Sequence, residues 1–315
     1  MALRGAMHRA GAAALTELLR TTAPVEMAVS CRCGHPAHYH QMRPKQLLTV
    51  LGRLEIERAY YMCPHCHQGQ SPRDKELDVE GTECSPGVRR MMALVGSESS
   101  FEQSREQLEL LAGIEVTAKA VERQAEGIGA DIAAREDEEI RRAKQLELPE
   151  VCAPAVPILY IEMDGTGVPV VKVETEGRVS KIEGVPAHTR EVKLGCVFTQ
   201  TQPTRTAGPC AMKIPRPTSR PSRPPRNSAC DSTPKPVGAA GAGPRRRRSS
   251  ATAPSGSGVG SGVVEAGCKT VVATRLKRSG MFWTVRGAND AIIALRCCRL
   301  CCRFENYWEA RSPAA

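Results

Sequence analysis

The chain has 315 residues, a formal net charge of +10 and 14 cysteines. This length is enough for about two domains, and no run of about 18 apolar residues is present, so the sequence predicts neither a membrane-spanning helix nor a membrane partner. So many cysteines without a secretory signal favour metal binding over a disulfide framework.

An N-terminal helical segment is predicted over residues 1–26, with the helix ending before Pro24. The segment is basic and mildly apolar, but Glu17 interrupts it and no small-residue cleavage site follows it. A soluble helix is therefore favoured over a signal peptide, and we expect a cytoplasmic protein.

Two closely spaced cysteine pairs lie in the next segment, residues 27–80, and 29 residues separate them. The pairs are Cys31 with Cys33 and Cys63 with Cys66. The residues between them alternate like strands, with Gly52 near the bend of a predicted hairpin. Two thiolate pairs on turns joined by a hairpin can close a tetrahedral zinc site, so we predict a zinc-ribbon-like module with structural zinc.

Other interpretations of these cysteines stay open. The nearby imidazoles are alternative zinc ligands: His35, His38, His65 and His67. The four cysteines could also be reduced, buried thiols without a metal. A redox role for the Cys-x-x-Cys pair is disfavoured because no thioredoxin-like βαβ pattern surrounds it.

A helical domain is predicted over residues 86–150. Pro86 fits the first turn of one helix, a second covers about 101–112 and stops at Gly113, and Thr117 can cap the third. The last two helices have the proportions of a helix-turn-helix, in which Lys119 and Arg123 would face DNA phosphates. An ordinary helical hairpin explains the pattern equally well.

Residues 155–201 switch to the alternating pattern of strands. We predict a strand, a tight turn at Gly165–Gly167, a second strand, and a third strand over 190–200. Asp164 would then lie at the end of an apolar strand, where a carboxylate can hold a divalent ion for phosphoryl chemistry. From spacing alone, Asp-Gly-Thr-Gly is more simply a turn.

The composition changes abruptly over residues 202–257. This segment carries eleven Lys and Arg and one acid, Asp231, so its net charge of +10 equals that of the whole chain. Eleven of its 56 residues are proline, and it has no leucine and no aromatic residue. Such a composition cannot bury enough apolar surface to offset chain entropy, so we predict disorder.

Helical spacing returns in the C-terminal part, residues 258–315, which contains both tryptophans and four closely spaced cysteines (Cys297, Cys298, Cys301 and Cys302). Glu265 falls near the start of the first helix. On its own, it is a first-turn acid that complements the helix dipole.

Long stretches of the chain are similar to the Kra-type family of insertion-sequence (ISKra) transposases, which are DDE enzymes. The similarity covers residues 20–201, including CRCGHPAHYH, SPGVRRMMALVGSESSFEQSREQ and YIEMDGTGVPVVK, and resumes over 260–297 with GSGVVEAGCKTVVATRLKRSG. It implies an RNase H-like core whose three carboxylates bind two Mg²⁺ or Mn²⁺ ions and drive DNA cleavage and strand transfer. It also implies the element's terminal repeats as a DNA partner, and a homo-oligomer.

Two members of the implied carboxylate triad have counterparts in this chain. The first Asp of the family motif matches Asp164, and the terminal Glu matches Glu265. The second Asp belongs to a Gly-Asp-Gly-Ala-Glu-Trp-Ile-Trp stretch in the family, and this chain has no such stretch. The resemblance therefore implies a damaged active site.

A frameshift near Thr201, reversed by a deletion near residues 257–260, would account for this loss. Codons can be chosen for Ser249–Gly258 that encode Val-Val-Gly-Asp-Gly-Ala-Glu-Trp-Ile-Trp one base out of frame, with Thr252 supplying bases for the missing Asp. The same shift would explain the charge and the prolines of 202–257. Sequencing the gene tests this hypothesis, which fails if neither other frame across 202–257 encodes family-like sequence.

The sequence therefore predicts an α+β protein with a zinc-ribbon-like module, a helical linker domain, a truncated RNase H-like core and a disordered insert. Truncation should leave an unpaired sheet edge and exposed apolar surface. The expected function is that of an insertion-sequence transposase whose catalysis is lost. The alternatives are a zinc-dependent DNA-binding remnant and a translation product without function.

Overall fold

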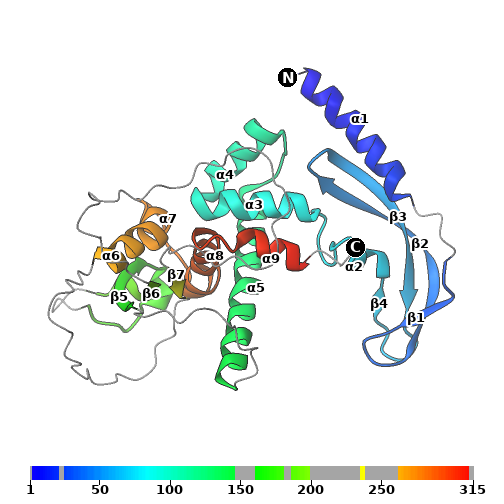
Figure 1. Cartoon of the computed structure of the whole chain (residues 1–315). Helices are drawn as coiled ribbons and strands as arrows, with labels where there is room; N and C mark the ends of the chain where they lie inside the picture. Colours follow the sequence, from blue (N-terminus) through cyan, green and yellow to red (C-terminus); the bar gives the residue numbers. More distant parts are fainter. Residues whose placement is uncertain are drawn as a thin grey trace, which may run out of the picture. The chain divides into compact units, whose positions relative to one another are not determined.

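The computed structural model describes residues 2–20, 25–145, 160–180, 186–198, 235–237 and 262–311 (Figure 1). The chain divides into two compact units. The N-terminal unit comprises residues 1–129 together with 303–315, and the second unit comprises residues 130–302.

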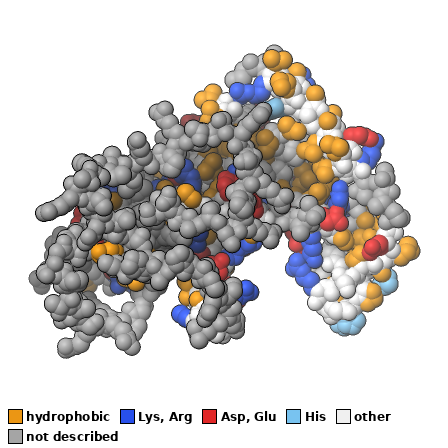
Figure 2. All heavy atoms as spheres, viewed as in Figure 1, with side chains coloured by type: hydrophobic (Ala, Val, Ile, Leu, Met, Phe, Trp, Pro, Cys, Tyr) orange, Lys and Arg blue, Asp and Glu red, His pale blue; other side chains and the backbone are white. Residues whose placement is uncertain are grey.

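Helix α1 (Ala2–Leu19) opens the N-terminal unit, as predicted. It ends at Leu19, before Pro24 as predicted, and residues 21–24 lie outside the described residues. Helix α1 carries exposed hydrophobic side chains, among them Leu3, Met7 and Leu18. Figure 2 shows hydrophobic side chains gathered over this helix. Even so, the described part of the chain contains no helix long and apolar enough to cross a membrane.

The N-terminal unit contains one antiparallel sheet with the strand order β1-β2-β3-β4. The strands are β1 (Ala28–Ser30), β2 (Pro36–Thr49), β3 (Gly52–Met62) and β4 (Gly69–Gln70), and the short helix α2 (Pro72–Glu76) follows. Gly52 begins β3 with φ +115°, a conformation that glycine adopts far more readily than other residues. The predicted hairpin with Gly52 at its bend is confirmed.

The turn end and the open end of this hairpin have separate hydrophobic clusters. Near the turn, Leu47, Leu54 and Ile56 are buried with Val79, and Leu15 of α1 packs against them. At the open end, a second cluster joins the sheet to the cysteine loops; its buried members are Cys31, Ala37, Tyr61 and Cys63. The open end therefore holds the cysteine loops against a rigid strand pair.

Three helical segments follow the sheet, in agreement with the sequence. They are α3 (Pro86–Glu98), α4 (Phe101–Gln107) with its π-helical extension η1 (Leu108–Ala112), and α5 (Ala118–Lys144). The Ser85 hydroxyl caps α3 by accepting from Val88 N, and Thr117 Oγ1 accepts from Ala120 N at 3.1 Å, as predicted for the start of α5. Gly113, at φ +68°, ends η1.

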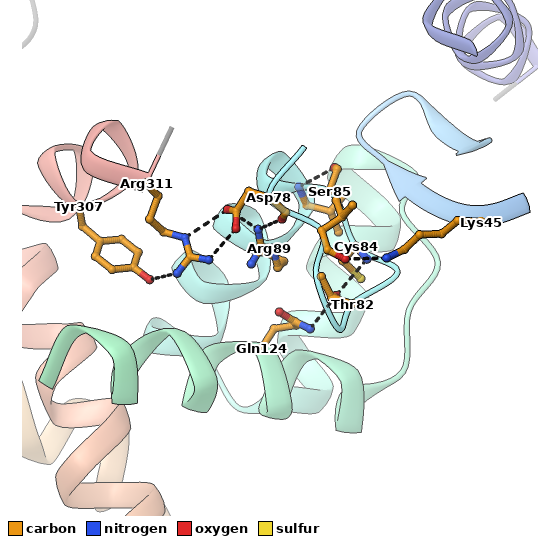
Figure 3. Close-up of polar contacts among 11 residues, drawn as sticks. Lys45, Asp78, Thr82, Cys84, Ser85, Arg89, Gln124, Tyr307 and Arg311 are labelled. Atoms are coloured by element: carbon orange, nitrogen blue, oxygen red, sulfur yellow. Dashed lines mark hydrogen bonds and ion pairs between the residues drawn. The ribbon is translucent and has the colours of Figure 1, made fainter. Parts of the chain in front are cut away.

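Helix α9 (Phe304–Arg311) belongs to the N-terminal unit although it lies at the other end of the sequence. Figure 3 shows its Arg311 facing Asp78, whose carboxylate also faces Arg89 of α3. Arg311 Nη2 lies 2.8 Å from Asp78 Oδ1, and Arg89 Nη2 lies 2.5 Å from Asp78 Oδ2. One carboxylate thus joins two arginines from distant segments of the chain.

The second unit contains an antiparallel sheet with the order β5-β6-β7. Strands β5 (Tyr160–Pro169) and β6 (Thr189–Phe198) pair along their full length, and β7 (Lys235–Val237) pairs with β6. A 3-10 turn, η2 (Lys172–Glu174), follows β5. Apart from β7, the segment 202–257, for which we predicted disorder, lies outside the described residues.

The predicted turn at Gly165–Gly167 is wrong, because β5 continues straight through it. Each residue of β5 has a partner in β6, and long-range pairing outweighs the local turn preference of Asp-Gly-Thr-Gly. The glycines leave room for the side chains of the paired strand β6. A Cβ at Gly165 would lie 2.4 Å from Glu191 Oε1, and one at Gly167 would lie 3.1 Å from Thr189 Oγ1.

The C-terminal part of this unit forms helical segments: α6 (Gly262–Gly267), η3 (Cys268–Ala273), α7 (Thr274–Leu276), η4 (Arg286–Ile293) and α8 (Ala294–Leu300). Of these, α6 contacts β5 and β6, and η3 contacts β5. A Cβ at Gly267 would lie 3.0 Å from Leu194 of β6, so glycine allows close approach to the sheet. On β5, Ile161 and Met163 are exposed.

Candidate metal centre

The four paired cysteines come together in the N-terminal unit. The sulfur atoms of Cys31, Cys33, Cys63 and Cys66 all lie within 4.8 Å of one another. Cys31 Sγ is 3.6 Å from Cys66 Sγ, and Cys33 Sγ is 3.6 Å from Cys63 Sγ. Four sulfurs placed ~2.3 Å from a tetrahedral ion lie about 3.8 Å apart, so the cluster has the dimensions of a zinc site.

Both cysteine loops are held by backbone hydrogen bonds. In the first, Gly34 N donates to Cys31 O, and Cys31 N donates to His35 O, each at 3.0 Å. Gly34 adopts φ +86°, which turns the chain back after Cys33. In the second, His67 N donates to Cys63 O at 2.9 Å. Each of the two loops therefore makes a turn that directs its cysteine pair toward the centre of the four-sulfur cluster.

The second loop also stabilises negative charge on sulfur. The backbone N–H of Cys66, with that of His65, donates to the Cys63 sulfur and lowers the pKa of Cys63 to about 6. Thiolate is the form that binds metals. The backbone N–H of Gln68 donates to the Cys66 sulfur and lowers its pKa in the same way. Desolvation and the neighbouring sulfurs outweigh this effect and raise the pKa of Cys66 to about 12. A bound divalent cation would relieve this repulsion among the thiolates.

Of the alternative imidazole ligands, two lie beside the cluster. His35 and His65 stack with their ring centroids 3.8 Å apart and their planes 7° apart, and Cys33 Sγ is 3.7 Å from His35 Nδ1. Ring nitrogens bind metals through lone pairs in the ring plane, so two parallel stacked rings are poorly oriented for one ion. The all-cysteine set therefore fits the geometry better.

The expected catalytic carboxylates lie in the second unit, on neighbouring elements. Asp164 is in the middle of β5, where its Oδ1 accepts from Gly165 N at 2.8 Å. Burial and the nearby Asp164 carboxylate raise the pKa of Cys268, which places Asp164 next to η3. Glu265 lies in α6, three residues before Cys268.

A further carboxylate that the sequence analysis missed is Glu162. Its Oε2 accepts from Val264 N of α6 at 3.2 Å, which ties β5 to the helix that carries Glu265. Its position two residues before Asp164 was the available signal, because alternate residues of a strand share a face. Within the described residues, no group of three potential ligand atoms within 4.8 Å includes Asp164 or Glu265.

The expected DNA contacts lie on the exposed side of α5. Lys119 and Arg123 are one helical turn apart and exposed, but Lys119 Nζ lies 2.9 Å from Glu122 Oε2. Glu126 is close by on the same helix, and desolvation together with Glu122 raises the pKa of Glu126. This helix face therefore carries mixed charge.

These features define an α and β protein with a four-cysteine cluster that could hold a metal ion. A family model described as an uncharacterised protein family, UPF0236, matches residues 12–192, more than half of the chain. The chain belongs to this uncharacterised family. No curated protein matches it.

Proposed function

We propose that this chain is a transposase by descent that binds zinc and DNA and does not cleave DNA. The observation that carries the proposal is the four-cysteine cluster, whose sulfur spacing fits Zn²⁺ and whose loops are fixed by the hairpin. The similarity of residues 20–201 and 260–297 to ISKra transposases adds DNA as the partner and an RNase H-like core as the ancestral fold.

Loss of catalysis follows from the carboxylates. Asp164 and Glu265 would hold Mg²⁺ or Mn²⁺, which supply charge stabilisation in phosphoryl transfer when bound. The family stretch that carries the second Asp is absent from the sequence. The UPF0236 match also ends at residue 192, ten residues before the composition changes. Both observations support a core interrupted after β6.

Two assays on the full-length chain test this proposal. We expect a labelled duplex that carries the ends of the genetic element to shift on a native gel with the zinc-loaded protein. A zinc chelator should abolish the shift, and added Zn²⁺ should restore it, because the hairpin loses its fold without metal. Supercoiled plasmid incubated with the protein and Mn²⁺ should stay uncut.

Either of two outcomes would contradict the proposal. A duplex that shifts equally with and without chelator removes the metal requirement. Nicking or linearisation of the plasmid that is lost in Asp164→Asn would mean that this chain has kept its catalysis.

A further inference from the structure

One face of the β2–β3 hairpin concentrates positive charge where the sheet register brings like charges together. Arg43 of β2 is paired directly with Arg58 of β3, and Lys45 lies two residues further along β2 on the same face. Like charges opposite each other in an antiparallel pair destabilise it. Arg43 is stacked 3.7 Å from the ring centroid of Tyr60, which leaves its charge in place.

Asp74 is the carboxylate that pairs with these cations. Its Oδ2 lies 3.1 Å from Lys45 Nζ, and its Oδ1 lies 2.8 Å from Arg58 Nε. All three side chains are largely buried, with 11% of Lys45, 14% of Arg58 and 13% of Asp74 exposed. Two buried cations therefore share one anion, and buried charge is costly unless it is balanced.

Hydrogen-bonding groups at this place also lack partners. Arg58 Nε and Asp74 Oδ1 lie 2.8 Å apart but are not aligned for a hydrogen bond, and Arg58 Nη1 and Ser71 Oγ have no partner among the described residues. Ser71 is only 8% exposed. Buried polar atoms are nearly always satisfied in folded proteins, so these point to a group that is supplied from outside.

A cavity of about 530 Å³ opens at the same residues. It is lined by Arg58, Tyr60, Ser71 and Asp74, by Cys31 and Cys66 of the metal centre, and by the charged residues Arg32 and Glu80. Arg32 and Glu80 pair with each other at 3.2 Å. The wall therefore combines the Arg58 guanidinium, which shares the Asp74 carboxylate with Lys45, with a hydroxyl and unmatched N–H donors. An oxyanion with several acceptor oxygens satisfies all three.

We infer that this cavity, with Arg58 and Ser71 at its wall, binds a phosphate group. Arg58 donates to the phosphate oxygens through its unpartnered Nη1, Ser71 donates its hydroxyl, and Lys45 and Arg43 add charge. Under the proposed function, on which the source of the ligand rests, this group is a backbone phosphate of duplex DNA. The contact is then independent of base sequence.

The test measures binding of zinc-loaded, full-length protein to a fluorescent duplex of arbitrary sequence at several salt concentrations. Arg58→Gln should weaken binding about tenfold and lower the salt dependence of log K by about 1. Ser71→Ala, a smaller change, should weaken binding severalfold. Arg53→Gln is the matched control, because it removes the same charge from the exposed opposite face of β3 and should bind like the wild type.

Metal content and thermal melting show whether each variant is folded. If Arg58→Gln does not fold, the binding measured for Ser71→Ala tests the inference. Wild-type affinity and salt dependence in both variants would overturn the inference while leaving zinc-dependent DNA binding intact. A second arm titrates inorganic phosphate and follows the melting temperature. If the wild type binds no duplex, the proposed function is wrong. In that case the phosphate site is still supported if phosphate raises the melting temperature of the wild type but not that of Arg58→Gln. If phosphate stabilises neither protein or both equally, the inference of a phosphate site is wrong as well.

Discussion

Cys63→Ser is expected to eliminate metal binding and unfold the hairpin module. Cys63 is fully buried, forms the base of the second cysteine loop and has the lowered thiol pKa. Zinc contributes about 10–16 kcal/mol in small zinc-dependent folds, which is as large as the ~5–15 kcal/mol that stabilises a typical domain. Metal analysis after gel filtration should find about one zinc ion per wild-type chain and essentially none in the variant.

Two controls separate this effect from a general loss of thiols. Cys302→Ser replaces an exposed cysteine of the second unit and should keep the full zinc content. His35→Ala should also keep it, because the stacked imidazoles are not ligands in the all-cysteine site. Zinc retained in Cys63→Ser but lost in His35→Ala would assign the ion to the histidine set instead.

Asp78→Ala is expected to destabilise the N-terminal unit by about 3–5 kcal/mol, the range for breaking a buried ion pair from one side. The Asp78 carboxylate lies between Arg89, whose side chain is 8% exposed, and Arg311, which is 19% exposed (Figure 3). Removing it leaves two guanidinium groups close together without their shared anion. Urea denaturation followed by Trp308 fluorescence in a Trp283→Phe background measures the change.

Glu305→Ala is the matched control for this prediction. Glu305 also joins α9 to α3, through Arg90, but both side chains are about half exposed. Exposed ion pairs contribute about 0–1 kcal/mol. Equal losses of stability in the two variants would contradict the role assigned to Asp78.

Features that depend on local rules could be predicted from the sequence. The spacing of the cysteines, the first-turn proline Pro86, the cap at Thr117 and the glycine at the hairpin bend each follow from a few neighbouring residues. The structure confirms these helices and strands. The cysteine cluster follows for the same reason, because a hairpin brings its two ends together whatever its length.

Features that depend on long-range pairing could not be predicted. The position of Asp164 within a strand required β6, whose pairing overrides a local turn signal. The basic face required the register that places Arg43 opposite Arg58, which is shifted by a bulge after Tyr39. Likewise, nothing in the pattern of α9 indicated that Arg311 would reach Asp78, 233 residues away.

X-ray absorption at the zinc edge, on the full-length protein purified without added metal, tests the central claim that four cysteines hold one zinc ion. We predict a single shell of four sulfur atoms at ~2.3 Å. A shell that includes nitrogen at ~2.0–2.1 Å, or protein that neither retains zinc nor takes it up, would contradict it.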